Sequence, residues 1–282
     1  MSAPASRAAT LQAEPTARMR GGGVRALWAG NPQAVVQRGL LAARSSSWAV
    51  VLSGFFEPVF YLLSLGIGLG VLIGDVQISG GTEVPYAAFI APALLAVSAM
   101  NGAIYDSTWN VFFKLNYGKL YEGMLATSLG PLDVALGEIL YALLRGLVYA
   151  TGFMIVMQVL GLNLAPTAIL ALPAVVLIAF GFASVGMAVT SYMKTFQHMD
   201  WINLVLLPMF LFSATFYPIT VYPEWVQGIV MAFPLWHGVE LIRGLTTGIL
   251  SPVMLVHVGY YLVMIALGLL FTTKRLRTLF LD

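Results

Sequence analysis

Long apolar segments dominate this chain and alternate with short polar connections. Each segment approaches or exceeds the ~20 residues that a helix needs to cross about 30 Å of hydrocarbon, except the fifth, which is short. The pattern therefore predicts an all-α, polytopic membrane protein with six transmembrane helices. We place the predicted spans at about residues 48–73, 86–109, 132–160, 168–192, 201–216 and 254–271.

The N-terminal region has a different composition. Residues 1–30 are rich in alanine, proline, arginine and glycine without any period, which predicts a disordered cytoplasmic tail. Asn31 and Pro32 then supply an N-cap and a first helical residue. They predict a modestly amphipathic helix over residues 32–45 that lies at the membrane interface and leads into the first span. Residues 31–282 are predicted to form one transmembrane domain.

Composition excludes several other classes of protein. Charged residues make up 9% of the chain and hydrophobic residues 59%, whereas soluble domains carry about 25% charged residues. So little polar surface does not cover a soluble globule. The chain contains no cysteine, which excludes disulfides, cysteine-ligated zinc and thiol catalysis.

Lysine and arginine are distributed unevenly between the predicted connections. Twelve of the fourteen lie in the N-terminal region, after the second span, after the fourth span and in the C-terminal tail. The opposite connections contain only Arg243, and Arg145 falls inside the third span. Because positively charged connections stay in the cytoplasm, both termini and residues 112–130 are predicted to be cytoplasmic.

Residues 112–130 form an unusual connection. The segment carries Lys114, Lys119 and Glu122 among aromatic and small residues, so it is too polar for a bilayer core and too apolar for a fully solvated loop. It is typical of a short amphipathic helix on the membrane face that offers side chains to a soluble partner. An ordinary interfacial loop is the alternative interpretation.

Residues 218–248 are apolar but are interrupted by prolines. Two helices of about ten residues fit between them, at 224–233 and 235–247, and neither is long enough to span. We predict a re-entrant helical hairpin that dips into the outer leaflet. Trp225, Trp236 and His237 suit headgroup depth, and Glu240 and Arg243 follow on the second helix.

Motifs for catalysis are missing from the sequence. No GxxxxGK[ST] phosphate loop is present, because Gly118-Lys119 is followed by Leu120 and has no glycine five residues before Gly118. The three histidines are scattered without metal-ligand spacing, and no GxSxG motif occurs. We therefore predict no catalytic residue, no metal site and no nucleotide held by this chain.

Ionisable residues inside predicted spans are expensive and are usually paired. Glu57 lies in the first span, and Glu138 and Arg145 share a face of the third. They either line a polar path or lock helices together, with Arg145 paired to Glu57 or Glu138 for purely structural reasons. Both interpretations stay open.

Aromatic residues cluster in the first and fifth spans. They either face lipid and pack the helices or line a substrate path. The candidates for such a path are Phe55, Phe56, Phe60, Phe210, Phe212 and Phe216.

Several stretches in order resemble the permease subunits of type-2 ABC exporters, especially the nodulation-type lipo-oligosaccharide and daunorubicin-resistance types. The matching stretches are Glu57-Pro58 with LSLGIGLG, Tyr86 with FIAP, YEGMLAT from Tyr121, Gly137-Glu138, FASVGM from Phe182, and FPLWH from Phe233 through Leu241-Ile242-Arg243. The likeness covers roughly residues 32–275.

The resemblance implies an assembly in a bacterial plasma membrane. Two permeases, identical or sister subunits, would pair among membrane lipids, and a dimer of cytoplasmic ATPase subunits would bind ATP and magnesium and drive them. Residues 112–127 would be the coupling helix that contacts the ATPase, the N-terminal amphipathic helix would also contact it, and the hairpin would close the external side. The implied contact residues are Phe112, Phe113, Lys114, Tyr117, Lys119, Tyr121, Glu122 and Met124.

The sequence thus supports one main hypothesis, a permease that exports an amphipathic lipid, a lipid-linked saccharide or a hydrophobic drug. An ion- or proton-coupled secondary transporter is a second hypothesis, which requires an internal repeat that the two halves do not show. A polytopic lipid-modifying enzyme is a third, which requires acids or histidines gathered at one interface. No nucleic-acid partner is expected.

Overall fold

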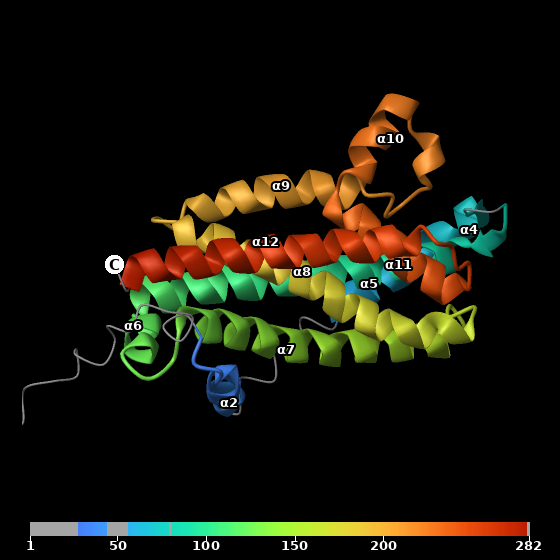
Figure 1. The fold of residues 1–282 in the computed structure, drawn as a ribbon. Helices are drawn as coiled ribbons and strands as arrows, with labels where there is room; N and C mark the ends of the chain where they lie inside the picture. The colour runs from blue at the N-terminus through green and yellow to red at the C-terminus, as the bar shows by residue number, and fades with distance from the viewer. Residues whose placement is uncertain (1–27, 44–55, 79–80, 281–282) are drawn as a thin grey trace, which may run out of the picture.

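The computed structural model describes residues 28–43, 56–78 and 81–280, and these are almost entirely helical. Figure 1 shows long helices running side by side along one axis, with the short helix α2 lying across them. The long helices are Phe56–Ile73, which includes α4 (Gly70–Ile73), α5 (Tyr86–Tyr105), α7 (Pro131–Val159), α8 (Ala171–Tyr192) and α12 (Met254–Phe280).

Five of the helices in the described residues are long and apolar enough to cross a membrane. The chain is therefore a multi-pass membrane protein. The fifth predicted span, residues 201–216, corresponds to α9 (His198–Phe212), which has 15 residues. At about 1.5 Å per residue, α9 is shorter than the roughly 30 Å of a hydrocarbon core, so a total of six crossings stays a prediction. Residues 48–55 of the first predicted span lie outside the described residues.

Two helices extend beyond the ends that we predicted. The helix that begins as α5 runs on to Tyr117, through the π-helical turns η3 (Asp106–Asn110) and η4 (Phe113–Tyr117), and not to residue 109. The last helix reaches Phe280 and not residue 271. Charged residues enter both extensions, Lys114 in the first and Lys274, Arg275 and Arg277 in the second, so the hydropathy falls while the helix continues.

A small β-hairpin corrects the all-α prediction. Strands β1 (Asp75–Gln77) and β2 (Glu83–Pro85) pair antiparallel, with Val76 opposite Val84. Gly74 and Gly81 have φ of +74° and +80°, so the chain turns there in a conformation that favours glycine. Three-residue strands are too short to leave a period in the sequence.

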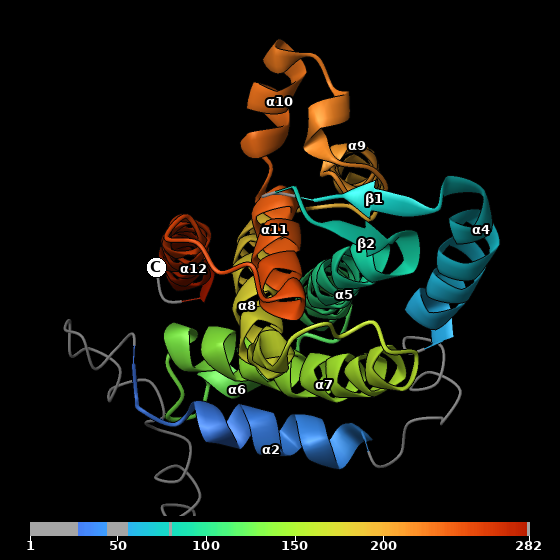
Figure 2. The same cartoon turned by 90° about the vertical axis from the view of Figure 1, so that its right-hand side faces the viewer.

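The connections gather at two opposite ends of the bundle. Figure 1 shows α4, α10 (Glu224–Met231) and α11 (Pro234–Thr247) at one end, and α6 (Leu120–Leu125) with the C-terminal end of α12 at the other. Pro234 occupies the first turn of α11, and Gly248, at φ +79°, ends it in the left-handed conformation. In Figure 2, α11 lies among α5, α8 and α12, while α10 projects away from them.

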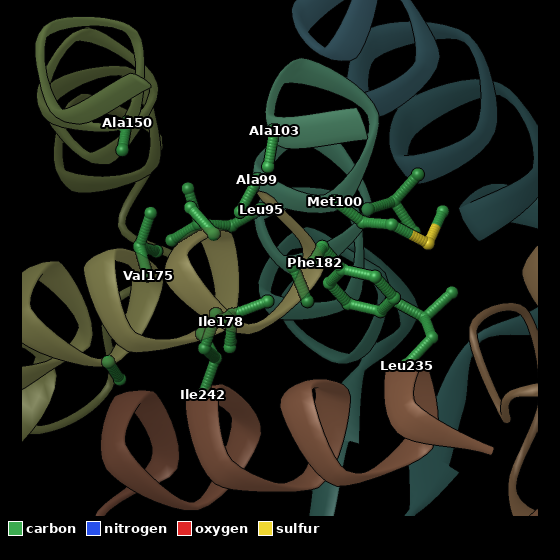
Figure 3. Packing of buried hydrophobic residues seen from close by; sticks show 14 of the residues in the cluster. Leu95, Ala99, Met100, Ala103, Ala150, Val175, Ile178, Phe182, Leu235 and Ile242 are labelled. Atoms are coloured by element: carbon green, nitrogen blue, oxygen red, sulfur yellow. The ribbon is translucent and has the colours of Figure 1, made fainter. Parts of the chain in front are cut away.

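The core is built where α5, α8 and α11 meet. Figure 3 shows Leu95 and Met100 of α5, Ile178 and Phe182 of α8, and Ile242 of α11. Small residues let the helices approach one another closely, as is typical of packing in membranes. The closest approaches include Gly181 against Tyr261 and Gly268 against the backbone of Ser184.

Helix α2 (Pro32–Ala43) lies against α7. Residues 44–45 of the predicted interfacial helix lie outside the described residues, as does nearly all of the predicted tail at 1–30. Val35 is buried in the seam, and a Cβ placed on Gly137 would lie 2.5 Å from the Val35 Cβ and 2.8 Å from the Pro32 carbonyl oxygen. Only a glycine at residue 137 permits this approach.

Candidate functional site

Residues 106–130, which we call the connecting segment, differ in shape from the single coupling helix predicted over 112–127. The helix that begins as α5 continues through η4 to Tyr117, and a separate short helix, α6, follows. Lys119 joins them with φ +46°, in the left-handed region that a lysine rarely adopts. The segment is therefore bent, and α6 returns the chain to the start of α7.

The predicted ATPase-contact residues separate into an exposed group, a buried group and Lys114, which is partly exposed and pairs with Glu138. Phe113, Tyr117, Lys119 and Glu122 are exposed on the connecting segment. The side chains of Phe112, Tyr121 and Met124 are buried within the protein in this conformation, and a contact role for these three stays a prediction. The face of α6 that carries Tyr121 and Met124, predicted to contact the ATPase, packs here against the rest of this chain.

Tyr121 is the most enclosed residue of α6. Its side chain has 0% exposure, and its hydroxyl has no hydrogen-bond partner within the described parts of the chain. Burial raises the pKa of this hydroxyl well above its usual range, and the negative charge of Glu138 raises it further. The hydroxyl therefore stays protonated and is a buried donor without an acceptor.

Glu138 joins three elements at this end of the bundle. Its carboxylate, 7% exposed, accepts from Lys114 Nζ of the connecting segment at 2.5 Å and from Arg38 Nη2 of α2 at 3.3 Å. The alternative in which Glu138 pairs with Arg145 is wrong. Glu138 and Arg145 are seven residues apart and share a face of α7, but each pairs with residues from other helices.

Arg145 binds Asp106 of the connecting segment. Asp106 is 8% exposed and also accepts from Asn110 Nδ2 at 2.7 Å. The sequence analysis missed Asp106, although an acid inside the predicted second span was a visible signal. Neither Glu57 nor Glu138, the two partners that we considered for Arg145, is its partner here.

Asp133 was also missed, and it fastens the N-terminal segment to α7. Its fully buried carboxylate accepts from the backbone nitrogens of Ala29 at 2.6 Å, Gly30 at 3.1 Å and Asn31 at 3.0 Å. It also accepts from Gly130 at 2.9 Å, at the start of its own helix. An acid three residues after a Gly-Pro helix start is a capping signal, but the distant partners leave no trace in the sequence.

A hollow of about 630 Å³ lies between the helix Phe56–Ile73 and helices α5, α7 and α9. Three residues singled out in the sequence line it: the intramembrane charges Glu57 and Arg145, and the predicted path residue Phe210. Polar groups that we did not predict complete the wall, and apolar side chains form the rest. The additional polar lining residues are Tyr61, Ser98, Asn101, Tyr105 and Tyr149.

The other predicted path aromatics are not among the lining residues of this hollow. Phe56 and Phe60 stack on each other at 5.6 Å and are exposed. Phe216 packs edge-on against Phe210 at 5.1 Å, and Phe212 is exposed. Phe55 lies outside the described residues. Of the six aromatics, only Phe210 is brought to the hollow by the described helices.

The hairpin residues form a buried cluster rather than a uniform interfacial layer. His237 Nδ1 lies 2.7 Å from His257 Nδ1 of α12, Trp236 packs edge-on against both rings, and Tyr260 stacks on His237 at 4.1 Å. Burial, and to a smaller extent the neighbouring His257, lower the pKa of His237 to about 4, so His237 is neutral near pH 7. Trp225 is 73% exposed on α10, and its membrane depth stays a prediction.

Arg243 clamps α11 to two neighbours. Its guanidinium lies 4.0 Å over the Phe89 ring, donates to Glu240 Oε1 at 2.6 Å and donates to the Ala214 carbonyl at 2.9 Å. Burial lowers the pKa of Arg243, and Glu240 opposes that shift. Arg243 is therefore a buried structural cation and not an interfacial positive charge.

The described sites offer aromatic surface, hydrogen bonds and ion pairs. Across residues 28–43, 56–78 and 81–280, no three His, Asp or Glu side chains gather closely enough to hold a metal ion. The arrangement offers an exposed docking face on the connecting segment, a polar hollow, and ion pairs between them.

Comparison with known proteins agrees with this arrangement. Residues 32–247 match the ABC-2 type transporter family. The chain is 33% identical to nodulation protein J of Rhizobium leguminosarum bv. viciae over 258 residues, which cover 90% of this chain and 98% of that protein. It is also similar to nodulation protein J of Sinorhizobium fredii, at 33% over 211 residues (74% and 79%), and of Rhizobium meliloti, at 30% over 230 residues (81% and 84%).

Proposed function

The chain belongs to the ABC-2 type transporter family, and from this premise we propose that it is the membrane subunit of an ATP-driven exporter whose ATPase is a separate chain. The resemblance to type-2 ABC permeases in the sequence motifs is thereby confirmed at the level of the family. As a subunit of a transporter, the chain is not itself catalytic. ATP and magnesium are held by the proposed partner.

The exposed side of the connecting segment supports the proposed ATPase contact. Phe113 lies 5.4 Å from Tyr117 and 6.1 Å from Phe196, which comes from the connection between α8 and α9, and all three rings are exposed. Lys119 and Glu122 are also exposed, a few residues further along the connecting segment. Exposed aromatic side chains with charged residues nearby in the chain are typical of a surface that docks into a protein groove.

The distribution of charge supports the proposed orientation, with both termini in the cytoplasm of a bacterium. Lys114, Lys119 and Lys274 belong to the end of the bundle that holds α6, and acids such as Asp75 and Glu224 belong to the other end. Positively charged connections stay in the cytoplasm. The hairpin of α10 and α11 would then lie on the external side.

The hollow supports an amphipathic substrate. Arg145, Asn101 and the tyrosines offer hydrogen bonds to a polar headgroup, while leucine, valine and Phe210 offer apolar surface. An amphipathic lipid or lipid-linked saccharide fits this mixture better than a wholly apolar drug, because buried polar groups require partners. We propose that two such permeases, identical or sister subunits, pair in the membrane.

The single observation that carries the function is the family match over residues 32–247 of a chain without a phosphate loop. We propose that ATP binding closes the partner ATPase, which moves the connecting segment and shifts the helices between two packings. Binding energy at the ATPase would thus reach the hollow through protein contacts.

The test measures ATP hydrolysis by the complex that co-purifies with this chain. Glu122→Arg reverses an exposed charge on the connecting segment, and Glu224→Arg reverses an exposed charge at the opposite end as a matched control. We expect only Glu122→Arg to lower the stimulation of the ATPase by the permease, with assembly unchanged. Transport by the purified chain in vesicles without any ATPase would overturn the proposal and favour a secondary transporter.

A further inference from the structure

The ion pair between Lys114 and Glu138 connects the ATPase-facing segment to the third span. Lys114 lies on η4, one residue from the exposed Phe113, and its Nζ is 2.5 Å from Glu138 Oε2. Glu138 lies on α7, which also carries Arg145 in the wall of the hollow. This ion pair, together with that of Asp106 and Arg145, joins the connecting segment to the helix that lines the hollow, and Lys114–Glu138 is the one nearer in the chain to the exposed Phe113.

Helix α2 and the residues before it are fastened to α7. The Asp133 carboxylate binds three backbone nitrogens of residues 29–31, and Gly137 brings the α2 backbone into close contact with α7. Arg38 is thus held near Glu138 by contacts that do not involve the connecting segment. Of the two cations on Glu138, Lys114 is the one that a moving segment would carry away.

A buried carboxylate that loses a partner needs another donor. Tyr121 of α6 provides one, because its hydroxyl is buried without a partner among the described residues. Glu138 and Arg38 are the charged groups whose electrostatic effect reaches this hydroxyl. The Tyr121 hydroxyl is thus an unsatisfied donor near Glu138, the carboxylate that would need a donor once Lys114 has left.

We infer that Glu138 is the positioning residue through which the connecting segment moves the third span, by exchanging Lys114 for the Tyr121 hydroxyl between two states of the transport cycle. The inference rests on the proposed function and extends it from the docking face to the interior. Lys114 bound to Glu138 defines the conformation described here. When the segment shifts, Tyr121 donates to Glu138 and keeps the buried charge satisfied.

In the inferred exchange, Glu138 keeps Arg38 and one further donor in both conformations. Without Tyr121, removal of Lys114 would leave Glu138 with Arg38 alone, at 3.3 Å, and the segment would be held in one position. A bistable element of this kind is what transmits a movement between two sites. Glu138 then acts through Lys114 and Tyr121, and not on the substrate.

The experiment uses the complex with its ATPase and needs no knowledge of the substrate. The chain has no cysteine, so Val159→Cys and Leu255→Cys place two spin labels on exposed positions at the far ends of α7 and α12. The label distance is measured without nucleotide and with ATP and vanadate. Lys114→Gln, Glu138→Gln and Tyr121→Phe are compared with Lys274→Gln, an exposed lysine of α12.

In the parent complex and in Lys274→Gln, we expect the distance to change with nucleotide. Lys114→Gln and Glu138→Gln are expected to lose that change and to lower the ATPase stimulation by roughly tenfold, within the range that couples two sites. The double variant should be no worse than either single variant, because both remove the same pair. Tyr121→Phe should lose the response at unchanged thermal stability, which loss of folding does not explain.

The outcomes separate the inference from the function. No distance change in the parent complex would overturn the proposed function itself. A normal response in Lys114→Gln, or additive losses in the double variant, would overturn the role of the Lys114–Glu138 pair. A normal response in Tyr121→Phe would overturn the exchange. If Glu138→Gln does not fold, Lys114→Gln still tests the ion pair and Tyr121→Phe still tests the exchange.

Discussion

The contact between α2 and α7 gives the sharpest prediction about stability, and Gly137→Ala is the perturbation. The new methyl group would lie 2.5 Å from the Val35 Cβ and 2.8 Å from the Pro32 carbonyl oxygen. Both atoms are close to the backbone of α2, so no flexible side chain gives way. Overpacking of this kind costs about 1–3 kcal/mol.

Gly146→Ala on the same helix is the matched control. A Cβ at Gly146 meets nothing within 4 Å, so this variant gains only the helix propensity of alanine, about 0.8–1 kcal/mol. Gly137→Ala gains the same propensity, and the difference between the variants isolates the collision. At about 2–4 °C for each kcal/mol, Gly137→Ala should melt about 2–12 °C below Gly146→Ala.

The assay is the loss of monodisperse protein on heating in detergent, followed by size exclusion. Proteolysis between α2 and the first span should also become faster in Gly137→Ala, because the helix is pushed away from α7. Equal melting temperatures for the two variants, or a higher one for Gly137→Ala, would refute the packing that places α2 against α7.

Three further predictions follow. Gly268→Ala should lower the melting temperature, because its methyl group would press on the backbone of α8. Gly259→Ala, on the same helix, meets nothing within 4 Å and should not lower it, and equal melting temperatures would contradict the α8–α12 contact. Arg243→Met leaves the partly exposed Glu240 without its cation and the Ala214 carbonyl without its donor, and should cost about 1–3 kcal/mol in unfolding; no measurable cost would show that the clamp is not structural. The pKa of His237 is about 4 in the folded chain against 6.5 in the unfolded chain, so the unfolded chain binds more protons between these pH values. The free energy of unfolding should therefore fall as the pH is lowered from 6.5 to 4, and a His237→Phe variant should show a shallower fall.

Five of the six predicted spans and their order agree with helices that are long enough to cross a membrane. A bilayer core satisfies no backbone polar group and tolerates few charges, so each crossing must be a long apolar helix whatever its neighbours are. The proline punctuation around residues 218–248 likewise indicated short helices, because proline removes a backbone donor and starts helices well. These rules are local, and they need no knowledge of packing.

The partners of the buried charges could not be predicted. Arg145 and Glu138 share a face of α7, yet Arg145 binds Asp106, and Glu138 binds Lys114 and Arg38. Which partner a charge finds depends on how neighbouring helices are rotated and how far they run. The π-helical turns of the connecting segment changed both of these, and nothing in the hydropathy marks them.

The sequence by itself determined that this chain crosses a membrane several times, that its positive charges favour one side, and that it resembles ABC-2 permeases. Only the tertiary structure decided that Tyr121 is buried, that Asp133 fastens residues 29–31 to α7, and that a polar hollow lies beside Arg145. The physical reason is the range of the interactions. Transfer of a helix into lipid depends on its own residues, whereas burial and pairing depend on contacts between residues that can be a hundred or more positions apart, such as Ala29 and Asp133 at a separation of 104 and Phe89 and Arg243 at 154.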